Sequence, residues 1–280
     1  MKKLTFLFSF VFLIFEINAQ ISLVKNVPFS NIGPAIMSGR VVDLAVNPQN
    51  PTEFYVAYAS GGLWYTNNNG TSFTAISENA PTQNMGAIAV DWKNGTIWAG
   101  TGESNSSRSS YAGIGVLKTN DNGKTWHNVG LTDSQHIGRI IINKNNPNEV
   151  VVAVIGNLYT PNKQRGVYKT TDGGANWTNI SKSLPQDLWV SRVIASQHKK
   201  ERVFVTLNGY RNDDFKPYVF VSDDFGNTWK TIQNGLPNAP VNVIKEDPEN
   251  ENLLFLGNDQ GVYVSFDHGE NWSVLENAMP

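Results

Sequence analysis

Carboxylates, arginines and tyrosines are concentrated in three polar segments of the chain: residues 101–113, 156–165 and 208–218. Glycoside hydrolysis requires two carboxyl groups at a defined separation, one acting as acid and the other as base or nucleophile. Glu103 with Asp213 or Asp214 is therefore the candidate catalytic pair, although the sequence does not give their distance. Ordinary solvated loops with local ion pairs, such as Glu103 with Arg108, would show the same composition.

Aromatic side chains alternate with hydrogen-bonding groups in these segments. Residues 184–192 add one of each, Trp189 and Arg192. Flat rings beside polar groups suit the recognition of a carbohydrate or a peptide. The candidate ligand-binding residues are Glu103, Arg108, Tyr111, Tyr159, Arg165, Trp189, Arg192, Tyr210 and Arg211. We therefore expect a protein or glycan partner, with no catalytic residue assigned with certainty.

The sequence gives little support for metal or cofactor chemistry. The four histidines are scattered without metal-ligand spacing, and there is no cysteine. Asp213-Asp214 and Asp223-Asp224 leave calcium as a weak option only, because no alternating run of oxygen ligands is present. We expect no metal and no cofactor.

Overall charge and composition narrow the function classes further. The chain of 280 residues has 22 Lys+Arg and 24 Asp+Glu, a net charge of −2, so there is no general electrostatic reason to bind nucleic acid. It contains 24 Gly, 13 Pro, 8 Trp, 9 Tyr and 14 Phe. Abundant turn residues and aromatics indicate many short strands joined by tight turns.

One octapeptide recurs five times, with Ser or Thr first, Asp third, Gly fifth and an aromatic residue eighth. The closing aromatics are 53, 51, 52 and 43 residues apart. An Asp at a turn can accept hydrogen bonds from its own loop, and Gly permits positive φ. These motif residues are expected to be structural: Asn68, Asp121, Asp172, Asp224, Asp267, Phe73, Trp126, Trp177, Trp229 and Trp272.

The flanks of the octapeptide repeat too. Each unit contains an apolar strand, an Asn-Pro-type turn or its equivalent, two further strands and a short strand after the aromatic. Four-stranded units of 40 to 50 residues are typical of propeller blades. The expected fold is all-β, a propeller of about five four-stranded blades in residues 20–280, closed or open. The blades are expected at residues 38–80, 85–131, 137–184, 189–236 and 240–280.

Strand direction predicts on which side a ligand would bind. Successive strands of a blade, a to d, are antiparallel, so the a–b and c–d turns lie on one face. The b–c and d–a loops lie on the other, and the three polar segments are b–c loops. Because irregular loops carry most binding sites, we expect the ligand on this second face.

The first nineteen residues resemble a secretory signal peptide. Lys2 and Lys3 precede the apolar run 4–15, and the small residue Ala19 provides a cleavage site. No later apolar stretch is long enough to span a membrane. We expect a secreted, periplasmic or cell-surface protein.

The octapeptide resembles the Asp-box of the BNR-repeat β-propellers. Segments such as 38–40, 100–105 and 136–139 look like exported bacterial propellers related to the sortilin N-terminal (VPS10-type) domain. That group is often labelled glycosyl hydrolase without a demonstrated reaction, and its members are typically longer. The resemblance implies a recognition scaffold, either a monomer or part of a longer chain, and a shortened member of the group.

Two enzyme families with Asp-boxes fit less well. Glycoside hydrolase family 74 places a catalytic Asp after the second strand of its first blade, where this chain has Ser60 or a near neighbour. Sialidases use three arginines as a carboxylate clamp. Arg40, Arg139 and Arg192 lie near the start of first strands, but the shared Gly-Arg context of Arg40 and Arg139 indicates a repeat feature. A polysaccharide hydrolase remains the alternative to a binding scaffold.

Overall fold

The structure is a computed structural model, and it describes residues 39–107 and 110–275. The expected signal peptide, residues 1–19, lies outside the described residues. The described residues belong to one compact unit, residues 36–280. No helix in the described part of the chain is long and apolar enough to cross a membrane.

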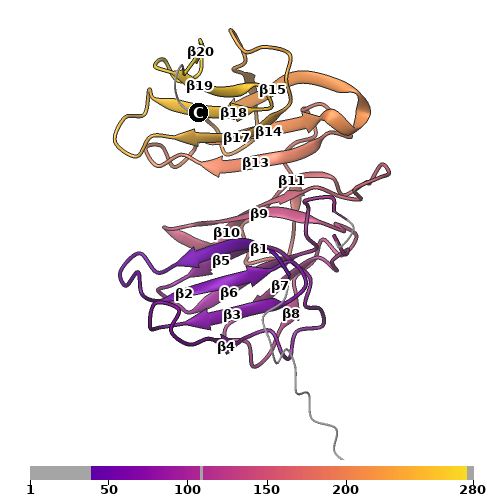
Figure 1. Cartoon of the computed structure of the whole chain (residues 1–280), viewed down its shortest axis with the longest axis vertical. Coiled ribbons are helices and arrows are strands. Elements are labelled where there is room, and N and C mark those ends of the chain that lie inside the picture. Colours follow the sequence, from indigo (N-terminus) through magenta and orange to yellow (C-terminus); the bar gives the residue numbers. More distant parts are fainter. Residues whose placement is uncertain (1–38, 108–109, 276–280) are drawn as a thin grey trace, which may run out of the picture. The chain divides into compact units, whose positions relative to one another are not determined.

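In the described residues, every regular element except one is a β-strand, and the strands form five four-stranded antiparallel sheets, here called blades 1 to 5 (Figure 1). The all-β fold of five four-stranded units is therefore confirmed. Blade 1 contains β1 (Val41–Val46), β2 (Phe54–Tyr58), β3 (Gly62–Thr66) and β4 (Thr74–Ala75). Blade 2 contains β5 (Met85–Asp91), β6 (Thr96–Thr101), β7 (Val116–Thr119) and β8 (His127–Asn128).

The remaining three blades repeat this order of strands. Blade 3 contains β9 (Ile137–Asn143), β10 (Asn146–Val154), β11 (Gly166–Thr170) and β12 (Thr178–Asn179). Blade 4 contains β13 (Trp189–Ala195), β14 (Val203–Gly209), β15 (Asp214–Ser222) and β16 (Lys230–Thr231), with the 3₁₀ turn η1 (Tyr210–Asn212) between β14 and β15. Blade 5 contains β17 (Val241–Glu246), β18 (Leu254–Asn258), β19 (Gly261–Ser265) and β20 (Ser273–Val274).

The octapeptide closes the hairpin between the third and fourth strands by bonding to itself. In blade 2, Thr119 Oγ1 donates to Asp121 Oδ1 (2.7 Å) and accepts from the Gly123 N–H (3.0 Å). Asp121 Oδ1 also accepts from the Thr125 N–H (2.9 Å), and Gly123 has a φ of 83°. Blade 1 makes the same contacts with Asn68 in place of Asp. Each motif is therefore satisfied within its own hairpin.

The closing tryptophan joins each blade to the preceding one. The indole N–H of Trp126, Trp177, Trp229 and Trp272 donates to a backbone carbonyl at the end of the preceding blade's fourth strand, at 3.3, 2.6, 2.9 and 2.8 Å. Phe73 of blade 1 has no such donor, and its ring instead meets Phe54 edge-on at 6.1 Å. The repeat therefore encodes the blade-to-blade junction as well as the blade.

The hydrophobic core lies between successive sheets. Apolar side chains of blades 1 and 2, 2 and 3, 3 and 4, and 4 and 5 form four separate clusters. Between blades 2 and 3, for example, Trp98 and Ile137 are fully buried. Burial of such side chains contributes roughly 1.5–3 kcal/mol each, so the junctions provide most of the stabilising burial.

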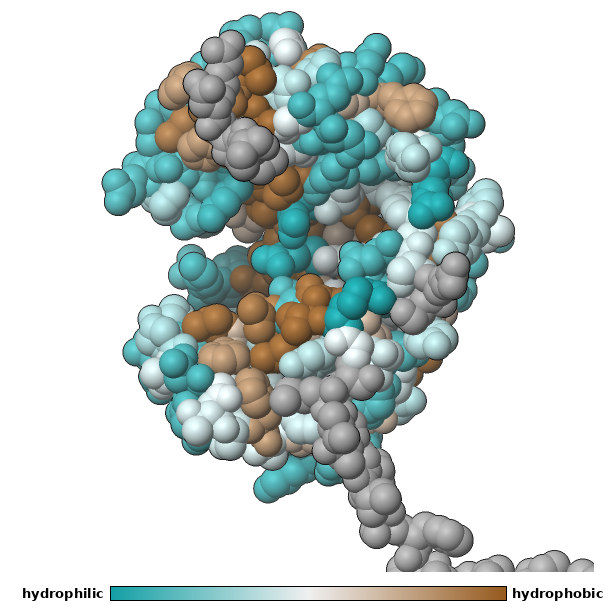
Figure 2. Space-filling view, viewed as in Figure 1, coloured by the Kyte–Doolittle hydropathy of each residue, from teal (hydrophilic) through white to brown (hydrophobic). Residues whose placement is uncertain are grey.

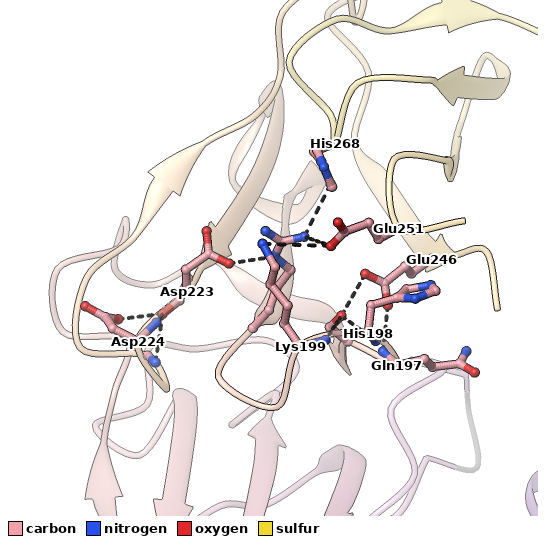
Figure 3. Close-up of polar contacts among 12 residues, drawn as sticks. Gln197, His198, Lys199, Asp223, Asp224, Glu246, Glu251 and His268 are labelled. Carbon is pink, nitrogen blue, oxygen red and sulfur yellow. Dashed lines mark hydrogen bonds and ion pairs between the residues drawn. The ribbon is translucent and has the colours of Figure 1, made fainter. Parts of the chain in front are cut away.

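A polar network reinforces the junction of blades 4 and 5 on the face of the Asp-box turns (Figure 3). The Arg202 guanidinium is nearly buried and donates to Asp223 (2.6 Å) and to His268 Nδ1 (3.3 Å). It also lies 3.8 Å from Glu251. Because Asp223 belongs to blade 4 while His268 and Glu251 belong to blade 5, the cation links the two sheets.

The succession of blades is open. The first strands, which are the inner strands, pack in the order β1, β5, β9, β13 and β17, and β17 has no comparable packing against β1. Leu44 of β1 is 54% exposed, whereas Ile88 and Ile140 at the same repeat position are 4% and 3% exposed. In the described residues, no blade covers the outer side of β1.

Candidate ligand-binding site

Glu103 lies just beyond β6 and is almost completely buried. Its carboxylate accepts hydrogen bonds from Arg40 (2.6 Å), the Ser110 hydroxyl and the Asn105 N–H (2.6 Å). A carboxylate with this set of donors holds the loop after β6 against blade 1. In this conformation it is not open to a substrate.

The other two candidate carboxylates lie at the tip of blade 4. Asp213 is exposed and adopts a left-handed conformation (φ 54°) at the end of η1. Asp214 accepts a hydrogen bond from the Tyr218 hydroxyl (2.7 Å), which lowers the pKa of this carboxyl group. Among the described residues, no hydrogen bond or ion pair connects Glu103 with either aspartate. The structure therefore does not assemble these groups as a bonded pair.

Aromatic and cationic candidates do come together. The Arg211 guanidinium carbon lies 5.8 Å from the Tyr159 ring centroid and 5.5 Å from that of Trp189. Arg211 also donates to the Ser106 hydroxyl (2.6 Å), which contacts the Tyr159 hydroxyl at 3.4 Å. We call these four residues the aromatic platform. They come from blades 2, 3 and 4, so only the blade arrangement brings them together.

The platform faces solvent. Tyr159 is 68% exposed and Arg211 is exposed, whereas Trp189 is half-buried at the start of β13. Tyr210 is also exposed, and its ring meets Phe215 edge-on at 5.9 Å. Arrangements of this kind offer flat apolar faces and a cation to a ligand.

The other expected ligand contacts lie elsewhere. Tyr111 is exposed in the loop after β6, and Arg108 is outside the described residues. Arg165 is buried, and its guanidinium donates to backbone carbonyl oxygens of four residues: Ile155, Asn157, Thr160 and Asp187. These bonds occupy the guanidinium, so Arg165 shapes the loop between β10 and β11 rather than offering a free cation.

Arg192 lies on inner strand β13, and Arg139 has the equivalent place on β9, whereas blade 1 has Asp43 there and Arg40 lies three residues earlier. Each inner strand has a β-bulge near its start, and in blades 3 and 4 the residue after the bulge is Arg139 or Arg192. Arg139 lies 3.3 Å from Asp43 of β1. Burial lowers the pKa of Arg192, and nearby Arg139 lowers it further, against the opposing effect of Asp43. The proximity of Arg139 and Arg192 depends on the packing of β9 against β13, which the local sequence does not predict.

The part of the chain that the structure describes contains no group of three or more His, Asp or Glu side chains that could hold a metal ion. The Asp223 and Asp224 side chains are occupied by protein donors, Arg202 for the first and Ser222 and Thr228 for the second. The acidic pair at 223–224 thus serves the hairpin and the blade 4–5 junction.

Comparison with known proteins gives two sequence matches to family models. Residues 115–236 match the model described as Sortilin-Vps10, "Sortilin, neurotensin receptor 3". Residues 263–274 match the BNR/Asp-box repeat. The second match covers the octapeptide of blade 5, and the first covers the last two strands of blade 2 and all of blades 3 and 4.

Similar proteins are enzymes and other propellers. A xyloglucanase from a Paenibacillus species is 28% identical over 165 residues, covering 57% of this chain and 15% of the enzyme. The structure of a family 74 glycoside hydrolase from Niastella koreensis superposes with a TM-score of 0.63 at 19% identity, covering 84% of this chain and 38% of that one. YCF48 from Cyanidioschyzon merolae gives 0.55 at 18% identity, covering 84% and 69%.

The chain thus spans 15% of the length of the curated enzyme and 38% of that of the solved one. At these identities the structural likeness shows the fold alone. The matched sequence models, the five repeated sheets and the superpositions agree with one another. The chain is an all-β array of propeller blades in which residues 115–236 match the Sortilin-Vps10 model and residues 263–274 match the BNR/Asp-box repeat.

Proposed function

We propose that this chain is a recognition scaffold that binds a glycan or protein ligand on the face of its b–c and d–a loops. The aromatic platform carries this proposal, because Tyr159 and Arg211 are exposed while Trp189 and Ser106 hold the cation in place. A cation fixed between two rings loses little side-chain entropy when a ligand binds. Such preorganisation is expected of a binding surface.

A carbohydrate is the first ligand class to test. Sugar rings present apolar C–H faces that pack on aromatic rings, and their hydroxyls can bond to Arg211 and Ser106. Tyr210 and Phe215 extend the apolar surface at the tip of blade 4. A protein ligand with a hot spot complementary to these rings would use the same surface.

The test is a binding panel of soluble polysaccharides and oligosaccharides read by isothermal titration calorimetry. Tyr159→Ala and Trp189→Ala should each weaken binding by roughly tenfold, in keeping with about 1–2 kcal/mol for an aromatic contact. Phe266→Ala is a matched control, because Phe266 is 72% exposed on the opposite, Asp-box face. Binding that survives both platform substitutions would refute the proposed surface.

Glycoside hydrolysis is the second candidate, favoured by similarity to a protein named xyloglucanase. It would require Glu103 with Asp213 or Asp214, yet Glu103 is buried and bonded to Arg40. Reducing-sugar release from a polysaccharide panel tests it, with Glu103→Gln as the matched variant. Turnover that the Gln variant abolishes would replace the binding proposal with an enzymatic one.

We also propose that the protein acts outside the cytoplasm, on the basis of the signal-like residues 1–19. Fractionation of cells that express the full chain should recover a shortened protein from the periplasm or medium. Deletion of residues 2–19 should keep it in the cytoplasm, and equal export of both forms would contradict the proposal.

A further inference from the structure

A groove runs along the inner strands of blades 3, 4 and 5. It has a volume of about 850 Å³ and is lined by β9, β13, β17 and the turns at their ends. Figure 2 shows the surface hollowed between these blades. Its floor is aliphatic and includes Ile141, Val193 and Val243. The groove is large enough for several residues or sugar units of an extended ligand.

Cations outnumber available carboxylates in this groove. Arg139 and Arg192 lie near one end, with Lys144 and Lys245 further along. Within the described ranges, neither lysine forms an ion pair, and Arg192 forms neither an ion pair nor a side-chain hydrogen bond. Asp43 is the one carboxylate paired with Arg139. The groove therefore has a local excess of positive charge.

The two carboxylates that line the groove are already occupied. Glu149 accepts from Asn143 (2.8 Å) and pairs with the Lys169 ammonium group. Glu246 is buried and accepts from the Ser196 hydroxyl (2.8 Å) and the Gln197 N–H (2.6 Å). Neither carboxylate contacts Arg192, Lys144 or Lys245, so the excess of cations is not neutralised from within the lining.

The repeat shows that these cations depart from the blade pattern. The position after the inner-strand bulge holds Asp43, Ala87, Arg139, Arg192 and Val243 in blades 1 to 5. Blade packing does not require arginine there, since blade 2 uses alanine. Yet the neighbouring blades 3 and 4 both place arginine there, and both Nε atoms are buried without a described hydrogen-bond partner. Unpaired buried donors are costly, and an anionic ligand would satisfy them.

We propose that the groove binds the carboxylates of an acidic polysaccharide, a chain of uronic acid units, whose neighbouring sugars stack on the aromatic platform. This inference rests on the proposed function, because it extends the same ligand beyond the platform. Trp189 and Arg192 lie on one strand, β13, opposite Asn208 and Thr206, so the bulge between them leaves them about two strand residues, or about 7 Å, apart. A chain stacked on Trp189 therefore reaches Arg192 next and Arg139 beyond it.

Flat rings favour a polysaccharide over an acidic peptide. Three of the four platform residues, Tyr159, Trp189 and Arg211, present planar groups where β13 begins, ahead of Arg192 on the same strand. Planar surfaces suit the faces of sugar rings, and the aliphatic floor tolerates their C–H groups. The acidic peptide is therefore kept as an outcome of the test.

The experiment titrates the full chain with polygalacturonate, with neutral xyloglucan oligosaccharides and with polyglutamate. At about 50 mM salt we expect polygalacturonate to bind at least tenfold more tightly than the neutral glycan. At about 500 mM salt this preference should shrink, because exposed charges are screened. Arg192→Gln and Arg139→Gln should each weaken polygalacturonate binding by roughly tenfold to hundredfold, as expected for a charged hydrogen bond.

Matched variants separate charge from folding. Arg192→Lys keeps the charge and should retain part of the preference, while Lys93→Gln removes an exposed lysine from the β5–β6 turn and should have no effect. Thermal unfolding of each variant checks its fold. Equal binding of acidic and neutral glycans, or an Arg192→Gln variant that binds polygalacturonate normally, overturns this inference and leaves the proposed platform intact.

The remaining outcomes are equally decisive. Polyglutamate that binds as tightly as polygalacturonate overturns the polysaccharide assignment. A roughly tenfold weakening of every glycan in Trp189→Ala, with loss of only the acidic preference in Arg192→Gln, supports both proposals. Failure of every glycan to bind overturns the inference about the groove and leaves a protein as the ligand of the platform.

Discussion

Hydrogen bonds donated to the Asp-box carboxylates favour the charged form of these side chains. The pKa of Asp172 falls from 3.8 to about 2, chiefly because the Asn176 side chain and N–H donate to the carboxylate. The pKa values of Asp121 and Asp224 fall to about 2 for the same reason. Asn68 makes equivalent contacts without a charge, so blade 1 lacks this titration.

This difference predicts how stability depends on pH. Because the folded-state pKa is depressed, the contribution of Asp172 is complete above its unfolded pKa near 4 and is lost as pH falls towards 2. Asp172→Asn should lower the melting temperature at pH 7 but flatten its decline between pH 4 and 2. Melting curves across pH 2–7 measure this, and parallel curves for the variant and the parent would contradict it.

The indole hydrogen bond of Trp177 joins blade 3 to blade 2. Trp177→Phe leaves the Val129 carbonyl without its donor at 2.6 Å and removes part of a packed ring. We expect a loss of about 1–3 kcal/mol in unfolding free energy, measured by urea titration. Phe73→Leu is the control, because no indole bond exists there. A Trp177→Phe variant as stable as the parent would show that the bond contributes nothing to the junction.

At the scale of elements, the inner strand and its neighbour decide how close two blades come. Gly100 of β6 faces blade 3, and a Cβ atom there would lie 2.4 Å from Ile137 Cγ2 and 2.9 Å from Ile137 Cβ. Gly257 of β18 has the same repeat position, but a Cβ there would meet only Val243 Cγ1 at 2.9 Å. The difference arises because no described blade follows blade 5.

Gly100→Ala should therefore destabilise the protein by about 1–3 kcal/mol through overpacking. Gly257→Ala should cost less than about 1 kcal/mol, because Val243 is 37% exposed and has room to shift outward. Chemical unfolding of the two variants compares them directly. Equal losses would mean that the inter-blade contact is not what restricts Gly100.

In the described residues the blades do not close into a ring, so substitutions at one repeat position affect stability differently in blade 1 and in blade 3. Leu44 and Ile140 occupy one repeat position, yet Leu44 is 54% exposed and Ile140 is 3% exposed. Leu44→Ala should change stability by less than about 0.5 kcal/mol, and Ile140→Ala should cost about 2–5 kcal/mol. Should Leu44→Ala prove as costly as Ile140→Ala in urea unfolding, β1 would be covered in solution.

The repeated hairpin motif is sufficient to predict the fold from the sequence. Five spaced octapeptides implied five sheets, because a turn that satisfies its own polar groups is determined by local sequence. The loop segments that could carry ligand contacts followed from strand direction. Tyr159, Trp189 and Arg211 were candidates on that basis, and the structure places them together.

The local sequence does not predict whether an individual polar side chain is buried, paired or exposed. Nothing in the local sequence distinguishes Arg165, whose guanidinium is filled by carbonyl groups, from Arg211, which remains exposed. Glu103 was the natural catalytic candidate, but its partner Arg40 comes from another blade. Burial and pairing across blades depend on distances between segments far apart in the chain.

By itself the sequence determined the hairpins, the number of sheets and the face that carries the long loops, since these follow from short-range patterns repeated five times. Only the tertiary structure decided which charged side chains are bonded within the protein and which stay accessible to a ligand. Arg139 and Arg192 line one groove because they have the same place after the bulge on two inner strands, β9 and β13, which pack side by side.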